Sequence, residues 1–272
     1  MHPVIQHILE RKGASIPLND GRKTALILFG GTMTGARGAG AVTALEELCL
    51  NKAFDMIFTI SAGFPNACYF LTGNTHQGAS IYYEELCSKE FISMPRVWDI
   101  VDIDYGLNVI KNKKPLDYEA LSRTQTDLYV RLLNISTGKP EYRNVKGKTP
   151  EELELVMHAA VSLPYLNPGS VELEDGRFKD AGTMDSDMIP SVEDVLLSDA
   201  TDILVIYNRP YQYEHIRSAG IFDSERLYRT VYRRRIFTRV HRSGDRKERH
   251  ARHGQSRQID IWRGRIDTAL IK

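Results

Sequence analysis

The chain has 272 residues, of which 42% are hydrophobic and 26% are charged, and its formal net charge is +1. This composition is ordinary for a globular α/β protein with a large core, and the length fits a single domain. There is no uninterrupted run of about eighteen apolar residues, so the sequence predicts no membrane span, and residues 1–12 lack the pattern of a signal peptide.

Charge is unevenly distributed along the chain. Residues 211–272 hold 16 Lys and Arg against 7 Asp and Glu, a net charge of +9, and the remaining residues hold 20 against 28, a net charge of −8. Such a basic segment favours contact with a membrane surface, a nucleic acid or the acidic body itself, or forms a solvated face. The three cysteines, Cys49, Cys68 and Cys87, predict free thiols in a reducing compartment.

Strands and helices alternate in the first part of the chain. The hydrophobic patterns predict a helix in residues 1–12, a strand at 24–29, a helix at 38–50, a strand at 57–60, a helix ending near residue 71 and a helix at 78–87. Residues 94–114 predict irregular structure, and residues 116–121 open another helix.

The second part of the chain adds strands that pair locally. Its patterns predict strands at 127–134 and 141–145, a helix at 149–161, a hairpin at 171–178, a helix at 191–197 and a strand at 202–207. This order predicts an α/β domain over residues 1–210, with a mostly parallel sheet sandwiched between helices. Residues 211–272 predict a basic, mainly helical C-terminal extension.

Residues 55–66 predict a buried strand that turns sharply into a helix at Ser61. A serine at such a turn projects its hydroxyl from the top of a sheet, and the next amide, that of Ala62, points at the group that the hydroxyl attacks. This nucleophile elbow is usually G-x-S-x-G, whereas here Thr59 replaces the first glycine and Gly63 keeps the second. The same pattern also arises where a small residue merely allows a tight junction between a strand and a helix. This stretch alone therefore makes Ser61 a candidate nucleophile and no more.

Two further stretches supply groups that a nucleophilic serine needs. The turn Gly30–Gly35 follows the first buried strand and offers backbone N–H donors for an oxyanion, at the sheet edge where ligands gather. Asp180 lies in a predicted loop after a short strand and is followed by the small residues Ala181 and Gly182. A carboxylate held there is a candidate base for Ser61.

Together these stretches resemble the patatin-like phospholipases, and their bacterial branch in particular. Residues 30–35 match the family's G-G-G-x-R-G loop with Thr32 and Thr34 as changes, residues 59–63 match the elbow with one change, and residues 180–182 match the D-G-G/A motif with one change. The likeness covers about residues 24–210. Arg37 opens a second register of the loop, but Gly30 follows the strand directly, which favours the first.

The resemblance implies a serine acyl hydrolase that acts on lipid or other acyl esters through a Ser-Asp dyad, with no cofactor or metal. Ser61 would attack the ester carbonyl, and Asp180 would take its proton. The implied oxyanion donors are the N–H groups of Gly30, Gly31, Thr32 and Ala62, and the implied supports of the elbow and loop are Thr59, Gly63, Gly35 and Gly182. We expect a cytoplasmic protein, in keeping with the predicted reducing compartment. Its basic segment would contact anionic membranes peripherally, and no nucleic-acid partner is expected.

Two other functions remain open. The three altered motifs suit a catalytically weak or inactive lipid-binding relative. A nucleotide-binding α/β protein is the third hypothesis, although residues 30–40 lack G-x-G-x-x-G and no acidic residue ends the next strand. His158 lies on a predicted apolar helix, which favours a core or rim histidine rather than a catalytic base. His250 and His253 have a spacing that suits zinc, but the sequence shows no evident third ligand.

Overall fold

The computed structural model describes residues 2–14, 20–96, 100–163, 169–182, 195 and 198–208, together with the backbone of 260–263. Residues 1–209 and 259–272 belong to one compact unit, and residues 210–258 make up a second. The basic C-terminal extension predicted over 211–272 therefore lies outside the described residues, apart from the short stretch 260–263.

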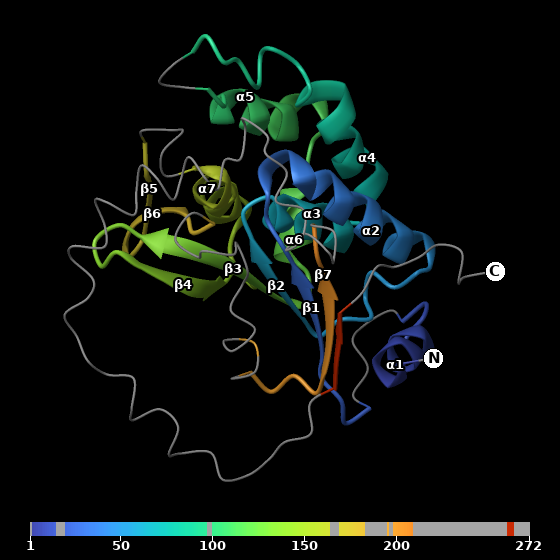
Figure 1. Cartoon of the computed structure of the whole chain (residues 1–272). Coiled ribbons are helices and arrows are strands. Elements are labelled where there is room, and N and C mark those ends of the chain that lie inside the picture. Colours follow the sequence, from blue (N-terminus) through green and yellow to red (C-terminus); the bar gives the residue numbers. More distant parts are fainter. Residues whose placement is uncertain are drawn as a thin grey trace, which may run out of the picture. The chain divides into compact units, whose positions relative to one another are not determined.

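The compact unit is built on an eight-stranded, mostly parallel sheet (Figure 1). Its strands are β1 (Thr24–Leu28), β2 (Met56–Ile60), β3 (Asp127–Asn134), β4 (Lys139–Asn144), β5 (Val171–Leu173), β6 (Gly176–Asp180), β7 (Asp202–Ile206) and β8 (Asp260–Arg263). Neighbours follow the order β5-β6-β3-β2-β1-β7-β8, with β4 also paired to β3. Strands β3, β2, β1, β7 and β8 run parallel, and β4, β5 and β6 add antiparallel pairs.

Helices flank this sheet, as the sequence predicts. They are α1 (Pro3–Glu10), α2 (Gly35–Glu47), α3 (Gly63–Leu71), α4 (Thr75–Ser80), α5 (Ile103–Asn108), α6 (Tyr118–Ser122) and α7 (Pro150–Val161), with a short 3-10 turn η1 (Thr32–Thr34) and two π-helical segments, η2 (Ile81–Glu85) and η3 (Val109–Lys113). None of the described helices has the length and apolarity needed to cross a bilayer.

The fully buried strands explain why the first two were predictable. Leu26 and Leu28 of β1 belong to the large core that includes residues of α2, α3 and α7, whereas Ala25 and Ile27 belong to a second cluster on the other face. A strand covered on both faces reads as a continuous apolar run, and the alternation of its side chains divides that run between two cores. The mostly parallel sheet and its flanking helices confirm the predicted fold class.

Three local predictions need comment. Residues 94–114 were predicted to be irregular, but α5 and η3 form there; their short length and the π-helical turns weaken a 3.6-residue pattern. In the segment predicted to be mainly helical, Asp260–Arg263 instead form β8, which pairs with β7 as a parallel strand. The helix predicted at 191–197 lies almost wholly outside the described residues.

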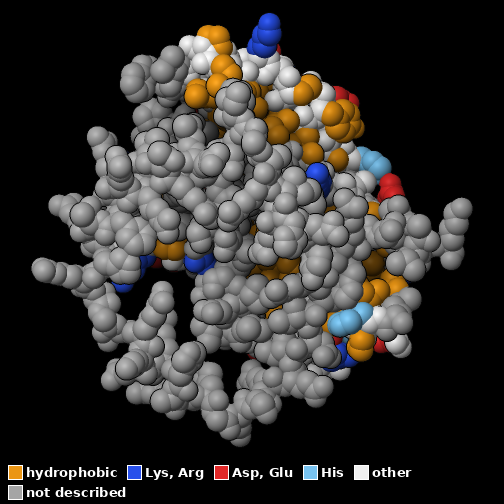
Figure 2. Space-filling view, in the orientation of Figure 1, with side chains coloured by type: hydrophobic (Ala, Val, Ile, Leu, Met, Phe, Trp, Pro, Cys, Tyr) orange, Lys and Arg blue, Asp and Glu red, His pale blue; other side chains and the backbone are white. Residues whose placement is uncertain are grey.

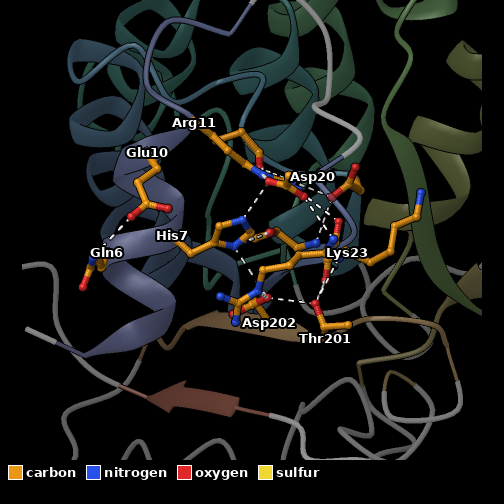
Figure 3. Close-up of polar contacts among 12 residues, drawn as sticks. Gln6, His7, Glu10, Arg11, Asp20, Lys23, Thr201 and Asp202 are labelled. Atoms are coloured by element: carbon orange, nitrogen blue, oxygen red, sulfur yellow. Dashed lines mark hydrogen bonds and ion pairs between the residues drawn. The ribbon is translucent and has the colours of Figure 1, made fainter.

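A cluster of charged side chains joins α1 to the amino ends of β1, β2 and β7 (Figure 3). Arg11, which is 1% exposed, donates to both oxygens of Asp20 and, at 2.6 Å, to Oδ2 of Asp55. His7 contacts Asp20 at 2.8 Å, and Arg22 donates twice to the fully buried Asp202. We call these residues the basal ion cluster. Its hydrogen bonds hold α1 against the amino ends of these strands, at the end of the sheet opposite to Ser61.

Candidate active site

Ser61 occupies a strained turn between β2 and α3. Its φ angle is +53°, in the left-handed region that non-glycine residues seldom adopt, and its residue is only 3% exposed. The N–H of Phe64 donates to the Ser61 carbonyl and so begins α3 immediately after the turn. The structure therefore places this serine as an elbow requires, directly after a buried strand and before a helix.

Two residues flanking Ser61 explain how the elbow is held. A Cβ atom built on Gly63 would lie 2.4 Å from the Leu28 carbonyl oxygen, so only glycine lets α3 approach β1 this closely. Thr59 is fully buried, and its hydroxyl donates to the Tyr129 carbonyl at 2.8 Å. The threonine that replaces the motif's first glycine thus ties β2 to β3.

Strand pairing along β3 brings Asp180 beside the elbow. Strand β4 pairs with β3 along one edge of that strand, and β2 and β6 pair with successive parts of its other edge. On that edge, Arg131 pairs with Ile60, the last residue of β2, and the next residue, Leu132, pairs with Asp180, the last residue of β6. Ser61 follows Ile60, so the register sets the serine next to the carboxylate. Asp180 therefore ends a strand, where the sequence predicted a loop.

Burial dominates the electrostatics of Asp180. The residue is 0% exposed, and the loss of water raises the pKa of its carboxyl group to about 7, an effect that the Ser61 hydroxyl and the Gly182 N–H partly oppose. Gly182 donates to Oδ1 at 2.7 Å. Oδ2 has no completed hydrogen bond to any described residue, although the Ser61 hydroxyl lies close enough to affect the pKa. Such a carboxyl group exchanges its proton near neutral pH.

The turn after β1 packs directly on Ser61. A Cβ built on Gly30 would lie 2.7 Å from the Ser61 Cβ and 3.4 Å from its Oγ, so the backbone touches the serine side chain. Gly31 and Thr32 both have positive φ angles, +130° and +50°. Thr34 closes this turn by donating to the Gly31 carbonyl at 2.7 Å.

The backbone N–H groups of this turn are free to act as donors. Within the described residues, those of Gly30, Gly31, Thr32 and Ala62 donate to no backbone or side-chain acceptor. Gly30 and Ala62 are buried, where backbone N–H groups are almost always paired, and Gly31 and Thr32 are half-buried. These four N–H groups could hold the negative charge of an oxyanion or another anionic group.

An apolar cavity of about 90 Å³ opens at Ser61. Thr32, Met33 and Ala62 line its start, and side chains such as Ile81, Phe91 and Ile110 line the rest. Both π-helical segments, η2 and η3, contribute to this wall. The cavity suits a hydrocarbon chain, and it offers few polar groups to a ribose or a phosphate.

Hydrophobic side chains also reach the surface near these elements. On the face seen in Figure 2 they gather in the upper part, the region of α4 and α5 in Figure 1. Tyr83 is 66% exposed and follows the cavity residue Tyr82, and Met94 is 57% exposed and lies three residues after Phe91.

Three residues near the site were not predicted from the sequence. Asn66 donates to the Gly35 carbonyl at 3.0 Å, and the Tyr82 hydroxyl donates to Asn66 Oδ1 at 3.1 Å. Burial raises the pKa of Tyr82, so its hydroxyl keeps its proton. Asn208 donates to two carbonyls of the turn after β1. Their only signal in the sequence is a polar residue in a mainly apolar helical segment or shortly after a buried strand.

Other candidate residues lie elsewhere. His158 lines a separate surface pocket with Leu107 and Glu151, away from the cavity at Ser61. Ser162 uses its hydroxyl to donate to the His158 carbonyl at 2.7 Å. Among the described residues, no three His, Cys, Asp or Glu side chains are grouped to hold a metal ion, and His250 and His253 lie outside them.

Comparison with known proteins gives little further information. No protein-family model matches the chain, and no curated protein does. Among solved structures, the chain is similar to VipD from Legionella pneumophila, at 14% identity and a TM-score of 0.43, over 60% of this chain and 46% of that one. The chain thus spans less than half of that protein's length. A likeness this distant carries no argument about activity.

Proposed function

We propose that this protein is a serine acyl hydrolase that acts on lipid esters. Ser61 is the nucleophile, Asp180 is the general base, and the N–H groups of Gly30, Gly31, Thr32 and Ala62 form the oxyanion hole. The observation that carries the proposal is the β3 register, which sets a serine at a strained elbow beside a buried carboxyl group.

The steps follow from the positions of these groups. Asp180 accepts the Ser61 proton as Oγ attacks the ester carbonyl, and the free N–H groups of the turn stabilise the oxyanion. The protonated Asp180 then gives its proton to the leaving alcohol. In the second half, Asp180 takes a proton from a water molecule as the water attacks the acyl-enzyme. The protonated Asp180 then returns this proton to Ser61 Oγ as the second tetrahedral intermediate collapses and the carboxylic acid leaves.

The substrate class follows from the cavity rather than from the dyad. The cavity wall is apolar, and exposed Tyr83 and Met94 lie close in sequence to its lining residues. An acyl chain buries apolar surface there and gains about 0.8 kcal/mol for each CH₂ group. We therefore propose esters of fatty acids rather than polar acyl groups.

Covalent labelling tests the nucleophile directly. A fluorophosphonate probe should label the wild-type protein at Ser61, as mapped by peptide mass spectrometry, and Ser61→Ala should abolish labelling and hydrolysis of nitrophenyl esters. Ser80→Ala is a matched control, because Ser80 is 6% exposed and, among the described residues, its hydroxyl donates to the Gln77 carbonyl alone. Labelling at Ser162 in place of Ser61 would refute the assignment.

The same assay separates the second candidate function. The positive φ angle of Thr32 favours a catalytically weak relative, because a β-branched residue is strained there and the turn is altered from the family's motif. Such a protein would bind a fatty acid in the cavity, which a fluorescent fatty acid would detect. It would neither hydrolyse the nitrophenyl ester nor react with the fluorophosphonate probe.

Membrane contact through residues 211–272 stays a prediction, because apart from the backbone of 260–263 these residues lie outside the described structure. Basic residues near an anionic surface contribute about 1 kcal/mol each, and salt screens this attraction. We expect salt-sensitive binding to anionic vesicles that weakens when Arg233, Arg234 and Arg235 are changed to Gln. Binding unaffected by both salt and the triple substitution would refute it.

A further inference from the structure

Asn208 is a buried side chain that holds the turn after β1. It lies two residues beyond β7 and is 2% exposed. Its Nδ2 donates to the Phe29 carbonyl at 2.6 Å and to the Gly30 carbonyl at 3.0 Å. One amide group therefore binds two consecutive carbonyls at the point where the chain leaves the sheet and passes Ser61.

The orientation of this amide is fixed by its surroundings. The opposite rotamer would place Oδ1 against two carbonyl oxygens, which repel it. In the observed orientation Oδ1 is buried with no partner among the described residues, and it lies 2.9 Å from a Cβ built on Gly38 of α2. The backbone of Asn208 is held as well, because Arg37 of α2 donates to its carbonyl at 3.1 Å.

These two hydrogen bonds determine where the neighbouring N–H groups point. The described peptide bonds are all trans, so the C=O and N–H of each peptide face in opposite directions. The Phe29 carbonyl shares a peptide with the Gly30 nitrogen, and the Gly30 carbonyl shares one with the Gly31 nitrogen. Holding both carbonyls toward Asn208 therefore turns both N–H groups away from it.

In an extended strand, successive carbonyls alternate between opposite directions. Here two successive carbonyls reach the same nitrogen, so the chain is turned at Gly30 and the two N–H groups point the same way. Consecutive N–H groups arranged in this manner form a concave site for an anion. Gly30 packs against the Ser61 side chain, and neither of these N–H groups donates to a described residue.

We propose that Asn208 is a positioning residue that sets the oxyanion hole by fixing the Gly30 and Gly31 N–H groups toward the carbonyl that Ser61 attacks. It touches no substrate and acts only through the backbone of the turn. This inference rests on the proposed hydrolase function, and it adds a residue from the far end of the domain to that site.

The test compares two variants by steady-state hydrolysis of a short nitrophenyl ester. Asn208→Ala should lower kcat by about 100-fold, the usual effect of losing an oxyanion donor, and leave KM within about twofold. The control is Thr126→Val, which removes another buried hydrogen bond from a side chain to a carbonyl, that of Thr126 to Phe54 at 3.0 Å, at the opposite sheet edge. It should leave both constants unchanged.

Asn208→Gln keeps the amide donors on a longer arm and serves if Asn208→Ala does not fold. Its kcat should fall between those of the wild type and Asn208→Ala. Independently of any variant, ¹⁵N-glycine labelling of the wild-type protein should show the Gly30 and Gly31 amide protons moving downfield when the fluorophosphonate adduct forms, because its P=O oxygen accepts from them.

The outcomes separate the two proposals. Wild-type protein that is not labelled at Ser61 refutes the hydrolase proposal itself. Wild-type protein that hydrolyses esters through Ser61, together with a folded Asn208→Ala or Asn208→Gln variant whose kcat stays within threefold, refutes the role of Asn208 alone. Unchanged Gly30 and Gly31 amide signals in the adduct refute the oxyanion hole at these two residues, and with it both the role of Asn208 and that part of the proposed function. Loss of kcat with an unchanged KM and a stable control supports it.

Discussion

Carboxylates are buried at both ends of the parallel strands, which form two edges of the sheet, but the groups around these carboxylates differ. In the basal ion cluster, Asp55 and Asp202 are 8% and 0% exposed, and each accepts hydrogen bonds from an arginine. At the other edge, Asp180 is equally buried, yet a backbone N–H and the Ser61 hydroxyl are the described groups that oppose its protonation. Compensated carboxylates fasten elements together, whereas a carboxyl group left near neutral pKa is able to move a proton.

The direction of the pKa shift expresses the same difference. The Arg11 guanidinium, with a smaller contribution from His7, holds the pKa of Asp20 well below its usual range, so this contact stabilises the fold above about pH 4 and is lost on acidification. Burial raises the pKa of Asp180 to about 7, so that residue favours the fold when protonated and lowers its stability as the pH rises from about 4 to 7.

Removing the charge of Asp180 should therefore have the largest effect on activity. We expect Asp180→Asn to lower kcat by about 10³-fold, because an amide cannot accept the Ser61 proton. The same variant should be more stable than the wild type at pH 8, by up to about 4 kcal/mol, since it has no charge to bury. Urea unfolding at pH 4 and pH 8 checks this.

The control for that experiment is Asp175→Asn in the turn between β5 and β6. Asp175 is 56% exposed and pairs with Arg143 at 2.7 Å, so its loss should change neither kcat nor the pH dependence of unfolding appreciably. An Asp180→Asn variant that is less stable than the wild type at pH 8 would contradict the account of Asp180 as a destabilising buried charge.

Breaking the basal ion cluster should affect stability alone. Arg11→Met leaves Asp55 buried without its guanidinium, and the loss of one partner of a buried pair costs about 3–5 kcal/mol. Lys111→Met is the matched control, because Lys111 and Glu154 form an exposed pair worth less than about 1 kcal/mol. Urea unfolding measures both, and kcat of the folded Arg11→Met protein should stay at the wild-type value.

The pH–rate profile of the wild type gives a smaller effect. The reactive form of Asp180 is ionised, so kcat/KM should rise about tenfold between pH 6 and pH 8 and level off above the pKa of about 7. Nitrophenyl ester hydrolysis across this range measures it. A profile that is already flat above pH 5 would mean that Asp180 is not the base or is not desolvated.

The sequence predicted those features of the candidate site that depend on local sequence. A continuous apolar run followed by small residues predicts an elbow at Ser61, and a glycine turn after β1 predicts free N–H groups. The pairing of Leu132 with Asp180 was not predictable in this way, because strand register depends on contacts between distant segments. The sequence also left Asp180 in a loop rather than at the end of β6.

Thr59 and Asn208 show a second limit. A motif comparison treats Thr59 as a lost glycine, whereas the structure shows its hydroxyl bonded to Tyr129 of the neighbouring strand. Asn208 follows a buried strand and carries no motif, so its two bonds to the turn after β1 require the paired strands β1 and β7 to be seen together. The same holds for Arg11, whose partners lie 9 and 44 residues away.

Backbone strain can also be compared between the candidate site and the region near α1. Among the described residues, the non-glycine positions with positive φ are Thr32 and Ser61 at the candidate site and Cys49 outside it, at +61°. Cys49 is exposed, and its carbonyl accepts from Gly13, just beyond α1. Both Thr32→Gly and Cys49→Gly should relieve strain of about 1–3 kcal/mol and pay about 0.5–1 kcal/mol in chain entropy, a net gain of about 1 kcal/mol.

Thr32→Gly should differ from Cys49→Gly only in catalysis. Thr32 lines the cavity beside Ser61, so its replacement enlarges the space next to the reacting carbonyl and should change KM for a nitrophenyl ester by about two- to fivefold, whereas Cys49→Gly should leave KM unchanged. Thermal unfolding and steady-state kinetics on both variants measure the two effects separately. If Thr32→Gly loses stability while Cys49→Gly gains it, the threonine side chain stabilises the turn by more than its strained backbone costs, and the altered glycine loop is a stabilising feature of this chain.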